Sequence, residues 1–230
     1  MQRARLALAA VVMLLAVSAS RASDVPASGI AVQVTAEALK ALRHGGYVMV
    51  LSHGSDANDE VDRQPVKPSQ CATQRSLTDT GRLMASGIGK LLARENVPVG
   101  MLLSSRYCRG VETAERIAEQ TRPRTVRRLD ALNEASAASP SEKERRMRAL
   151  RRLAGTAPSE GTNTLIVTHR SNMASAFGPE FAKVLDGELA VFLPAASIDA
   201  RPYRLAYRLK VTDLSAYAST RARPSKAEPS

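Results

Sequence analysis

Three short apolar segments constrain the fold of this chain more than any other feature. They cover residues 47–52 (YVMVLS), 99–105 (VGMLLSS) and 162–169 (TNTLIVTH), and each is bounded by turn-forming or polar residues. Continuous apolar runs of this length are typical of strands that are buried on both faces. We therefore predict that all three segments lie inside one sheet.

Segments with helical periodicity separate the apolar runs. The helix predicted over residues 77–96 buries one face, made of Leu83, Met84, Ile88, Leu91 and Leu92. Further helices are predicted over residues 35–46, 108–121 and 139–153, further strands over 189–194 and 203–211, and a polar loop over 56–70. Strands that alternate with amphipathic helices predict an α/β fold, a three-layer αβα sandwich around a mainly parallel central sheet.

The N-terminal segment has the order of a secretory signal peptide. Arg3 and Arg5 form a basic region, residues 6–17 are apolar, and small residues follow. The apolar run is shorter than the about 20 residues that a membrane span needs, which favours a cleaved signal over an anchor. We predict a signal peptide over residues 1–22, one domain over 23–213 and a disordered tail over 214–230. The protein is then periplasmic or secreted, without stable membrane insertion after cleavage.

Composition narrows the function classes. The net charge of +11 is spread along the chain and indicates a basic protein that attracts anions. Aromatic residues make up only 3% of the chain and Trp is absent, which argues against nucleic-acid binding through base stacking. Two cysteines without CxxC spacing and three histidines predict no metal site, and one disulfide would suit an exported protein.

Two His–Gly pairs flank the first apolar run, and only one of them fits a site. His44 follows Arg43 and precedes the run, whereas His53 follows Ser52 at its carboxyl end. Ligands of parallel α/β sheets bind outside the carboxyl ends of the strands. His169 ends a second apolar run in the same way. We therefore select His53 and His169 as site residues and predict that His44 has no role in the chemistry.

At four places the chain resembles the histidine phosphatase superfamily, in its phosphoglycerate-mutase-like branch. The similar segments are VMVLSHG at 48–54, SLTDTGR at 76–82, LLSSRYCRGVETAERIA at 102–118 and TLIVTHRSN at 164–172, in the order of the family. The resemblance implies an αβα sandwich and an enzyme that needs no metal or organic cofactor.

The resemblance also implies a role for each matched residue. His53 is the expected nucleophile, which attacks phosphorus and forms a phosphohistidine that water later hydrolyses. Arg109 is expected to hold phosphoryl oxygens, and His169 to donate a hydrogen bond to another. Glu134 follows the arginine helix, where the branch usually carries its proton donor. Glu160 and Asp56 are weaker candidates for that donor.

Ser52 departs from the family pattern, which has an arginine before the nucleophile. A hydrogen bond to a charged group contributes about 1.5–3 kcal/mol, so the loss predicts a slower enzyme rather than an inactive one. Arg75, Arg106 and Arg170 are candidates to return positive charge to the site, although each alone is read more simply as a surface residue. Together they predict a pocket that is still basic.

Two functions follow from these residues. The first is an exported phosphatase for small phosphomonoesters, weakened at Ser52. The alternative is a degenerate member that binds phosphate-bearing or other anionic ligands without turnover. A purely structural protein would leave the matched site residues unexplained, and an exported protein would not meet the substrates of a glycolytic mutase. The resemblance further predicts that Cys71 and Cys108 lie close enough for a disulfide that fixes the backbone beside Arg109.

Overall fold

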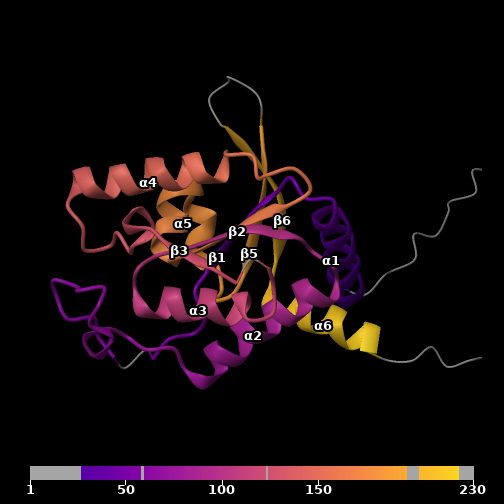
Figure 1. The fold of residues 1–230 in the computed structure, drawn as a ribbon, viewed down its shortest axis with the longest axis horizontal. Coiled ribbons are helices and arrows are strands. Elements are labelled where there is room, and N and C mark those ends of the chain that lie inside the picture. Colours follow the sequence, from indigo (N-terminus) through magenta and orange to yellow (C-terminus); the bar gives the residue numbers. More distant parts are fainter. Residues whose placement is uncertain (1–26, 58–59, 123, 196–201, 223–230) are drawn as a thin grey trace, which may run out of the picture.

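The computed structural model describes residues 27–57, 60–122, 124–195 and 202–222, so the predicted signal peptide lies outside the described residues. The described residues form a six-stranded sheet in the order β3-β2-β4-β1-β5-β6 (Figure 1). The strands are β1 (Val48–Ser52), β2 (Val99–Ser104), β3 (Val126–Arg128), β4 (Asn163–Thr168), β5 (Leu189–Pro194) and β6 (Tyr203–Leu209).

The sheet is mainly parallel, as predicted. Strands β3, β2, β4 and β1 run parallel to one another, whereas β5 pairs antiparallel with β1, and β6 antiparallel with β5. The prediction from the sequence contained every strand except β3, a three-residue strand at the sheet edge that is only partly buried.

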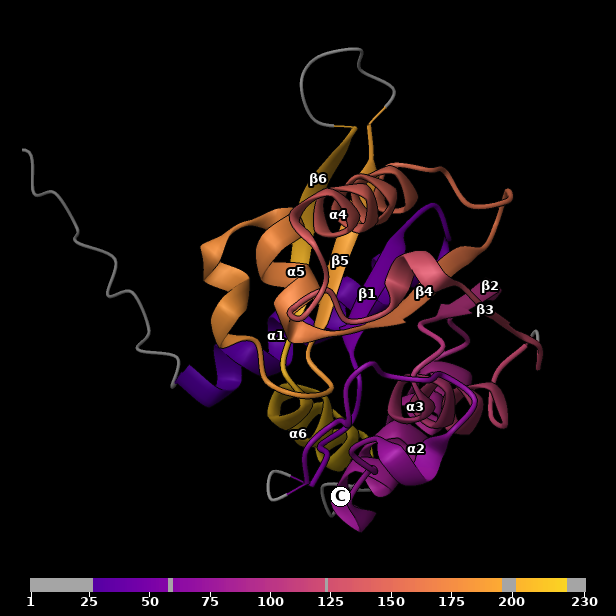
Figure 2. The ribbon, with the colours of Figure 1, turned by 90° about the vertical axis from the view of Figure 1, so that its left-hand side faces the viewer.

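Helices cover both faces of the sheet. The helices are α1 (Ala27–Arg43), α2 (Asp79–Arg94), α3 (Cys108–Ala118), α4 (Pro140–Ala154), α5 (Arg170–Phe177) and α6 (Val211–Ala222). Helices α4 and α5 lie on one face, and α1, α2, α3 and α6 lie on the other (Figures 1 and 2). This is the predicted αβα sandwich. Among the described residues, none of the helices combines the length and apolar character that a membrane span requires.

Strand β1 is apolar because helices cover the sheet on both of its faces. Met49 and Leu51 belong to the core under α1, α2 and α3, whereas Val48 and Val50 belong to the core under α4 and α5. Successive side chains of a strand point to opposite faces, so a strand covered on both sides has no position for a polar residue until it ends.

The pairing of β1 with β4 places the two predicted histidines side by side. These strands are parallel neighbours, with Ser52 opposite Thr168 at their carboxyl ends. His53 directly follows β1, and His169 directly follows β4. The backbone N–H of His53 donates to the Thr168 carbonyl at 3.1 Å. Both histidines therefore lie at the carboxyl ends of two adjacent central strands.

The predicted buried face of α2 is wrong at Leu83, whose side chain is 74% exposed. Leu83 lies five residues before Ile88, which is about 140° around a helix with 3.6 residues per turn. Ala85 lies close to the Ile88 face and is buried instead.

Both ends of the domain differ from the prediction. Helix α1 begins at Ala27, eight residues before the start of the helix predicted over residues 35–46. The predicted disordered tail is wrong for residues 214–222, which belong to α6. Leu214 and Tyr217 of that helix are buried, and the Tyr217 hydroxyl donates to Glu95 Oε2 at 3.0 Å. Residues 223–230 lie outside the described residues.

Cys71 and Cys108 form a disulfide, with their Cα atoms 5.6 Å apart, which confirms the predicted pairing. Cys71 begins the 3₁₀ turn η1 (Cys71–Thr73) after the polar loop, and Cys108 is the first residue of α3. The bond therefore joins the end of this loop to the residue that precedes Arg109.

Reduction of this disulfide should lower the free energy of unfolding by about 3–4 kcal/mol, because the bond closes a 37-residue separation and limits the unfolded chain. Urea unfolding of the protein with and without reductant measures the change. The Cys71→Ser/Cys108→Ser double variant is the control and should not respond to reductant. Equal unfolding midpoints for the oxidised and reduced protein would contradict the expectation.

Candidate active site

His53 presents one ring nitrogen to the site and uses the other to fix the ring. Its Nδ1 lies 2.7 Å from the Gly54 carbonyl oxygen. Because a carbonyl only accepts, Nδ1 carries the proton, and Nε2 of the neutral ring keeps its lone pair. The Nε–H of Arg109 donates to this Nε2 at 3.3 Å. The ring is therefore held in the tautomer that a nucleophilic Nε2 requires.

The surroundings of His53 keep the ring neutral. Burial, followed by the charge of Arg109, lowers the pKa of His53 to about 4. The unshifted value is near 6.5, so at neutral pH almost every copy has the lone pair available.

Arg109 lies in the first turn of α3, and its side chain is completely buried among three carboxylates. Nη1 and Nη2 donate to the two oxygens of Asp62 at 3.0 and 3.1 Å. Nη2 also donates to Glu134 Oε2 at 2.6 Å, and Nε lies 3.4 Å from Asp56 Oδ2. A buried guanidinium is stable only when its charge and its donors are matched in this way.

His169 is the second histidine of the site, and its ring centroid is 5.2 Å from that of His53. Its Nε2 lies 3.0 Å from the Ser105 hydroxyl, while Nδ1 is buried, makes no hydrogen bond to the described residues and lies 3.8 Å from Glu134 Oε2. Burial, and then the charge of His53, holds the pKa of His169 well below its usual range. Nδ1, the ring nitrogen of His169 without a hydrogen bond to the described residues, is therefore the one that faces Glu134.

Glu134 lies where the sequence predicted a site carboxylate. It accepts hydrogen bonds from Arg109 and from the Ser171 hydroxyl, the latter at 3.1 Å. Its backbone carbonyl accepts from Arg146 Nη1 at 2.7 Å, and Asn172 binds the backbone on both sides of it. Glu134 is thus fixed at both its side chain and its backbone. Glu160 is not among these contacts.

Asp56 is also part of the site, although the sequence ranked it below Glu134. Its side chain is buried, and burial raises its pKa against the opposing charges of Arg75 and Arg109. Both guanidiniums lie within 3.4 Å of Oδ2, but neither is aligned to donate a hydrogen bond to it.

The three arginines that were predicted to supply extra charge lie in different places and have different ion-pair partners. Arg75 lies in the site, with ion pairs to Asp56 at 3.2 Å and Glu134 at 3.4 Å. Arg106 does not line the same cavity as His53, and its half-exposed guanidinium pairs with Asp130 at 3.5 Å. Arg170 stays at the rim, where it lines the cavity but donates to Asp186 Oδ1 at 2.6 Å.

Ser52 brings no charge to the site. It is the last residue of β1 and is fully buried, and its hydroxyl makes no hydrogen bond to the described residues. Its carbonyl accepts from the Gly187 N–H at 3.2 Å. None of the arginines of the site is hydrogen-bonded to Ser52.

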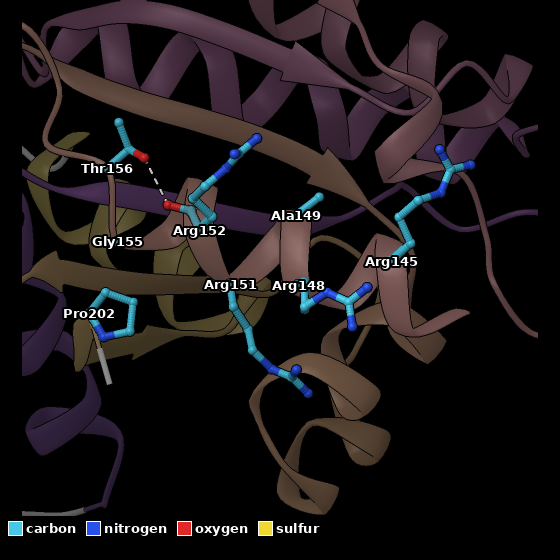
Figure 3. A pocket seen from close by; sticks show the side chains of 8 residues that line it. All are labelled: Arg145, Arg148, Ala149, Arg151, Arg152, Gly155, Thr156 and Pro202. Carbon is cyan, nitrogen blue, oxygen red and sulfur yellow. Dashed lines mark hydrogen bonds between the residues drawn. The ribbon is translucent and has the colours of Figure 1, made fainter. Parts of the chain in front are cut away.

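Part of the site lines a cavity of about 320 Å³, whose walls include His53, Asp56, Arg75, Glu134 and Arg170. A larger hollow of about 650 Å³ lies against α4 (Figure 3). Its walls carry Arg145, Arg148, Arg151 and Arg152 but no histidine and no carboxylate, so we place the site at the smaller cavity. In the described part of the chain, no three His, Cys, Asp or Glu side chains are grouped so as to hold a metal ion.

Sequence reasoning missed several residues of the site. Ser105, Ser171 and Asn172 fall inside the segments that carried the family resemblance, so their positions held a signal. Asp62 had none, because it lies in a polar loop without periodicity.

The family model described as histidine phosphatase superfamily (branch 1) matches residues 48–144. No curated protein sequence matches the chain.

Solved structures share the fold at low sequence identity. The protein histidine phosphatase SixA complexed with tungstate is 16% identical and has a TM-score of 0.51, covering 73% of this chain and 99% of that one. The mycobacterial glucosyl-3-phosphoglycerate phosphatase in complex with VO3 is 14% identical, with a TM-score of 0.52 and coverage of 71% and 98%. The phosphoserine phosphatase from Entamoeba histolytica, in complex with 3-phosphoglyceric acid, is 13% identical, with a TM-score of 0.50 and coverage of 73% and 98%.

The family match covers β1, β2, α3 and Glu134, which together supply most of the site. Over residues 48–144 the chain is therefore similar to the histidine phosphatase superfamily, branch 1, and its fold is shared with solved phosphatases.

Proposed function

We propose that the protein is a phosphomonoesterase that works through a phosphohistidine on His53. The observation that carries the proposal is the contact between His53 and Arg109. The unprotonated Nε2 of a neutral, buried histidine lies 3.3 Å from a guanidinium that is itself fully buried. A phosphoryl group at this contact would meet a nucleophile and a cation together, and phosphoryl transfer depends mainly on such positioning and electrostatic stabilisation.

The proposed reaction has two steps, in which His53 and Glu134 take part. The His53 Nε2 lone pair forms a bond to phosphorus, and the bond to the ester oxygen breaks. The leaving alkoxide takes a proton from the Glu134 carboxyl group. The Glu134 carboxylate then removes a proton from water, which attacks the phosphohistidine and releases inorganic phosphate and neutral His53. Covalent catalysis divides one difficult displacement into two easier ones.

His169 is suited to stabilise the charge that develops on a phosphoryl oxygen. The Ser105 hydroxyl can donate to its Nε2, which leaves the proton on Nδ1. That nitrogen is buried and makes no hydrogen bond to the described residues, so its N–H is free to donate to a ligand. The neutral His169 ring can donate this hydrogen bond without taking up the second proton that would make it an imidazolium.

Ser52 should weaken the enzyme. The family resemblance expects a guanidinium before the nucleophile, and a serine hydroxyl supplies no charge. Arg75 brings a second cation to the site, but it is already paired with Asp56 and Glu134. We infer a rate about one to two orders of magnitude below that of a site with both clamps.

The substrate class and location are part of the same proposal. A cavity of about 320 Å³ whose walls include Arg75 and Arg170 suits a small phosphorylated molecule. The signal-like residues 1–22 support export to the periplasm or the medium. The disulfide adds support, because such bonds persist in oxidising compartments.

The second candidate is a protein that binds phosphate-bearing or other anions without turnover. Ser52 favours it, since a buried hydroxyl without a hydrogen bond stands where the family resemblance expects a charged clamp. The three carboxylates around Arg109 also compete with an anion for that guanidinium.

The mature protein should hydrolyse an aryl phosphate slowly and without added metal, because an aryl leaving group needs little protonation. His53→Ala should abolish the activity, since it removes the ring nitrogen that lies 3.3 Å from Arg109 Nε. His44→Ala is the matched control and should have no effect, because His44 precedes β1 and is exposed. Steady-state release of the phenol measures both, and equal rates in wild type and His53→Ala would reject the proposal.

Restoring the missing cation should raise the rate. Ser52→Arg is expected to increase kcat/KM for the aryl phosphate about 10-fold or more, the effect of one charged hydrogen bond. Because Ser52 is fully buried, the folded state of the variant is checked by circular dichroism. Activity that appears only in Ser52→Arg would favour the binding candidate, and a folded variant with no gain would show that the missing charge is not the limit.

The pH dependence should follow the lowered pKa of His53. Protonation removes the lone pair, so kcat/KM should stay level down to about pH 5 and fall as the pH approaches about 4. The unfolded protein binds this proton near pH 6.5 and the folded protein near pH 4, so stability declines as the pH falls from about 6.5 to about 4, and the folded fraction is measured at each pH. An acidic limb near pH 6.5 in fully folded protein would contradict the expectation.

A further inference from the structure

We propose that Asp62 is a positioning residue, which turns one edge of the Arg109 guanidinium toward the nucleophile. The inference rests on the proposed function, since it assigns the means by which the cation of that site is aimed. Asp62 lies on the loop that the sequence left without a role.

The two edges of Arg109 have different partners. The end of the fork, Nη1 and Nη2, donates to Asp62 Oδ1 at 3.0 Å and Oδ2 at 3.1 Å. The side edge, Nε and Nη2, faces His53 Nε2 at 3.3 Å and Glu134 Oε2 at 2.6 Å. A guanidinium can bind two planar acceptors, one along each edge. With Asp62 on the end, the side edge is the one left for a phosphoryl group between the nucleophile and the acid.

Burial makes the pairing with Asp62 specific. The Arg109 side chain is 0% exposed and that of Asp62 is 11% exposed, so neither charge can exchange its partner for bulk water without a movement of the loop. Burial alone would raise the pKa of Asp62, but the hydrogen bond from the Arg75 N–H and the charge of Arg109 hold it below its ordinary value. Asp62 is therefore a carboxylate throughout the working range of the enzyme.

The loop that carries Asp62 is anchored close to the pair. The Arg75 N–H donates to Asp62 Oδ1 at 2.9 Å, and the Arg63 N–H donates to the Thr73 carbonyl at 2.9 Å. The Glu60 carboxylate accepts from the Ser76 N–H at 2.7 Å.

The disulfide completes this arrangement. Cys71 directly follows the loop that bears Asp62, and Cys108 directly precedes Arg109 in α3. The disulfide therefore joins this loop covalently to the helix that bears Arg109. A long arginine side chain has many rotamers, and fixing one of them matters most in a site where Ser52 supplies no second clamp. The loop supplies this restraint.

A rival interpretation makes Asp62 an internal competitor that occupies the phosphate position. The two interpretations predict opposite results. If Asp62 positions Arg109, removing its charge should misalign the side edge, lower kcat and weaken anion binding. If Asp62 competes, the same change should free the guanidinium and tighten anion binding.

The test compares Asp62→Asn with Glu60→Gln in the full mature protein with its disulfide intact. Asp62→Asn should lower kcat/KM for the aryl phosphate about 10–100-fold, mostly through kcat, and should weaken the binding of orthovanadate. Glu60→Gln removes a charge from the same loop but keeps a side-chain oxygen that accepts from the Ser76 N–H, so it should change neither quantity by more than about 2-fold. Thermal unfolding of each variant detects any loss of fold.

A double-mutant cycle shows whether Asp62 acts through Arg109. In the Arg109→Lys background the fork is gone, so Asp62→Asn should cause little further loss. A full 10–100-fold loss in that background, or tighter orthovanadate binding in Asp62→Asn alone, would overturn the inference.

A third readout needs no activity. The Nε–H proton of Arg109 should exchange slowly with solvent in the wild type and much faster in Asp62→Asn, as measured by NMR of the guanidinium. Unchanged exchange would overturn the inference by itself. A wild type that neither hydrolyses the aryl phosphate nor binds orthovanadate would instead reject the proposed function, so the two failures are distinguishable.

Discussion

The parallel pairing of β1 with β4 is the constraint on which the rest of the site depends. It sets Ser52 opposite Thr168, so that His53 and His169 leave the sheet as neighbours. On the other side of β4, β2 ends in register with the same edge, and the Ser105 N–H donates to the Val167 carbonyl at 3.0 Å. Three adjacent strands thus deliver both histidines and the helix that carries Arg109 to one place.

The electrostatics of the site follow from burying these groups together. Burial, and then the nearby positive charges, lower the pKa values of both histidines, so their rings stay neutral, as the proposed nucleophile and donor require. The guanidinium in turn needs negative partners, which Asp56, Asp62 and Glu134 supply. In the proposed mechanism, the same set of charges keeps the His53 ring neutral and limits how readily an incoming anion can reach the Arg109 guanidinium.

Much of the fold could be predicted because burial leaves a direct mark on sequence. Apolar runs marked the central strands, and the position of His53 after its strand, against that of His44 before it, selected the candidate site. Where contacts come from distant segments, the prediction failed. Arg106 and Arg170 pair with Asp130 and Asp186, and α6 owes its burial to a surface formed by α1 and α2. Asp62 reaches Arg109 only through a loop whose path is set by a disulfide and side-chain contacts.

The central claim is that His53 carries the phosphoryl group, and trapping the intermediate tests it most directly. The mature protein is mixed with an excess of aryl phosphate, quenched rapidly in alkali and fragmented for mass spectrometry that separates His53 from His44. The account predicts an acid-labile, alkali-stable phosphoryl group on His53 that is absent from His53→Ala. Turnover without any phosphorylated protein, or with the phosphoryl group on another residue, would contradict it.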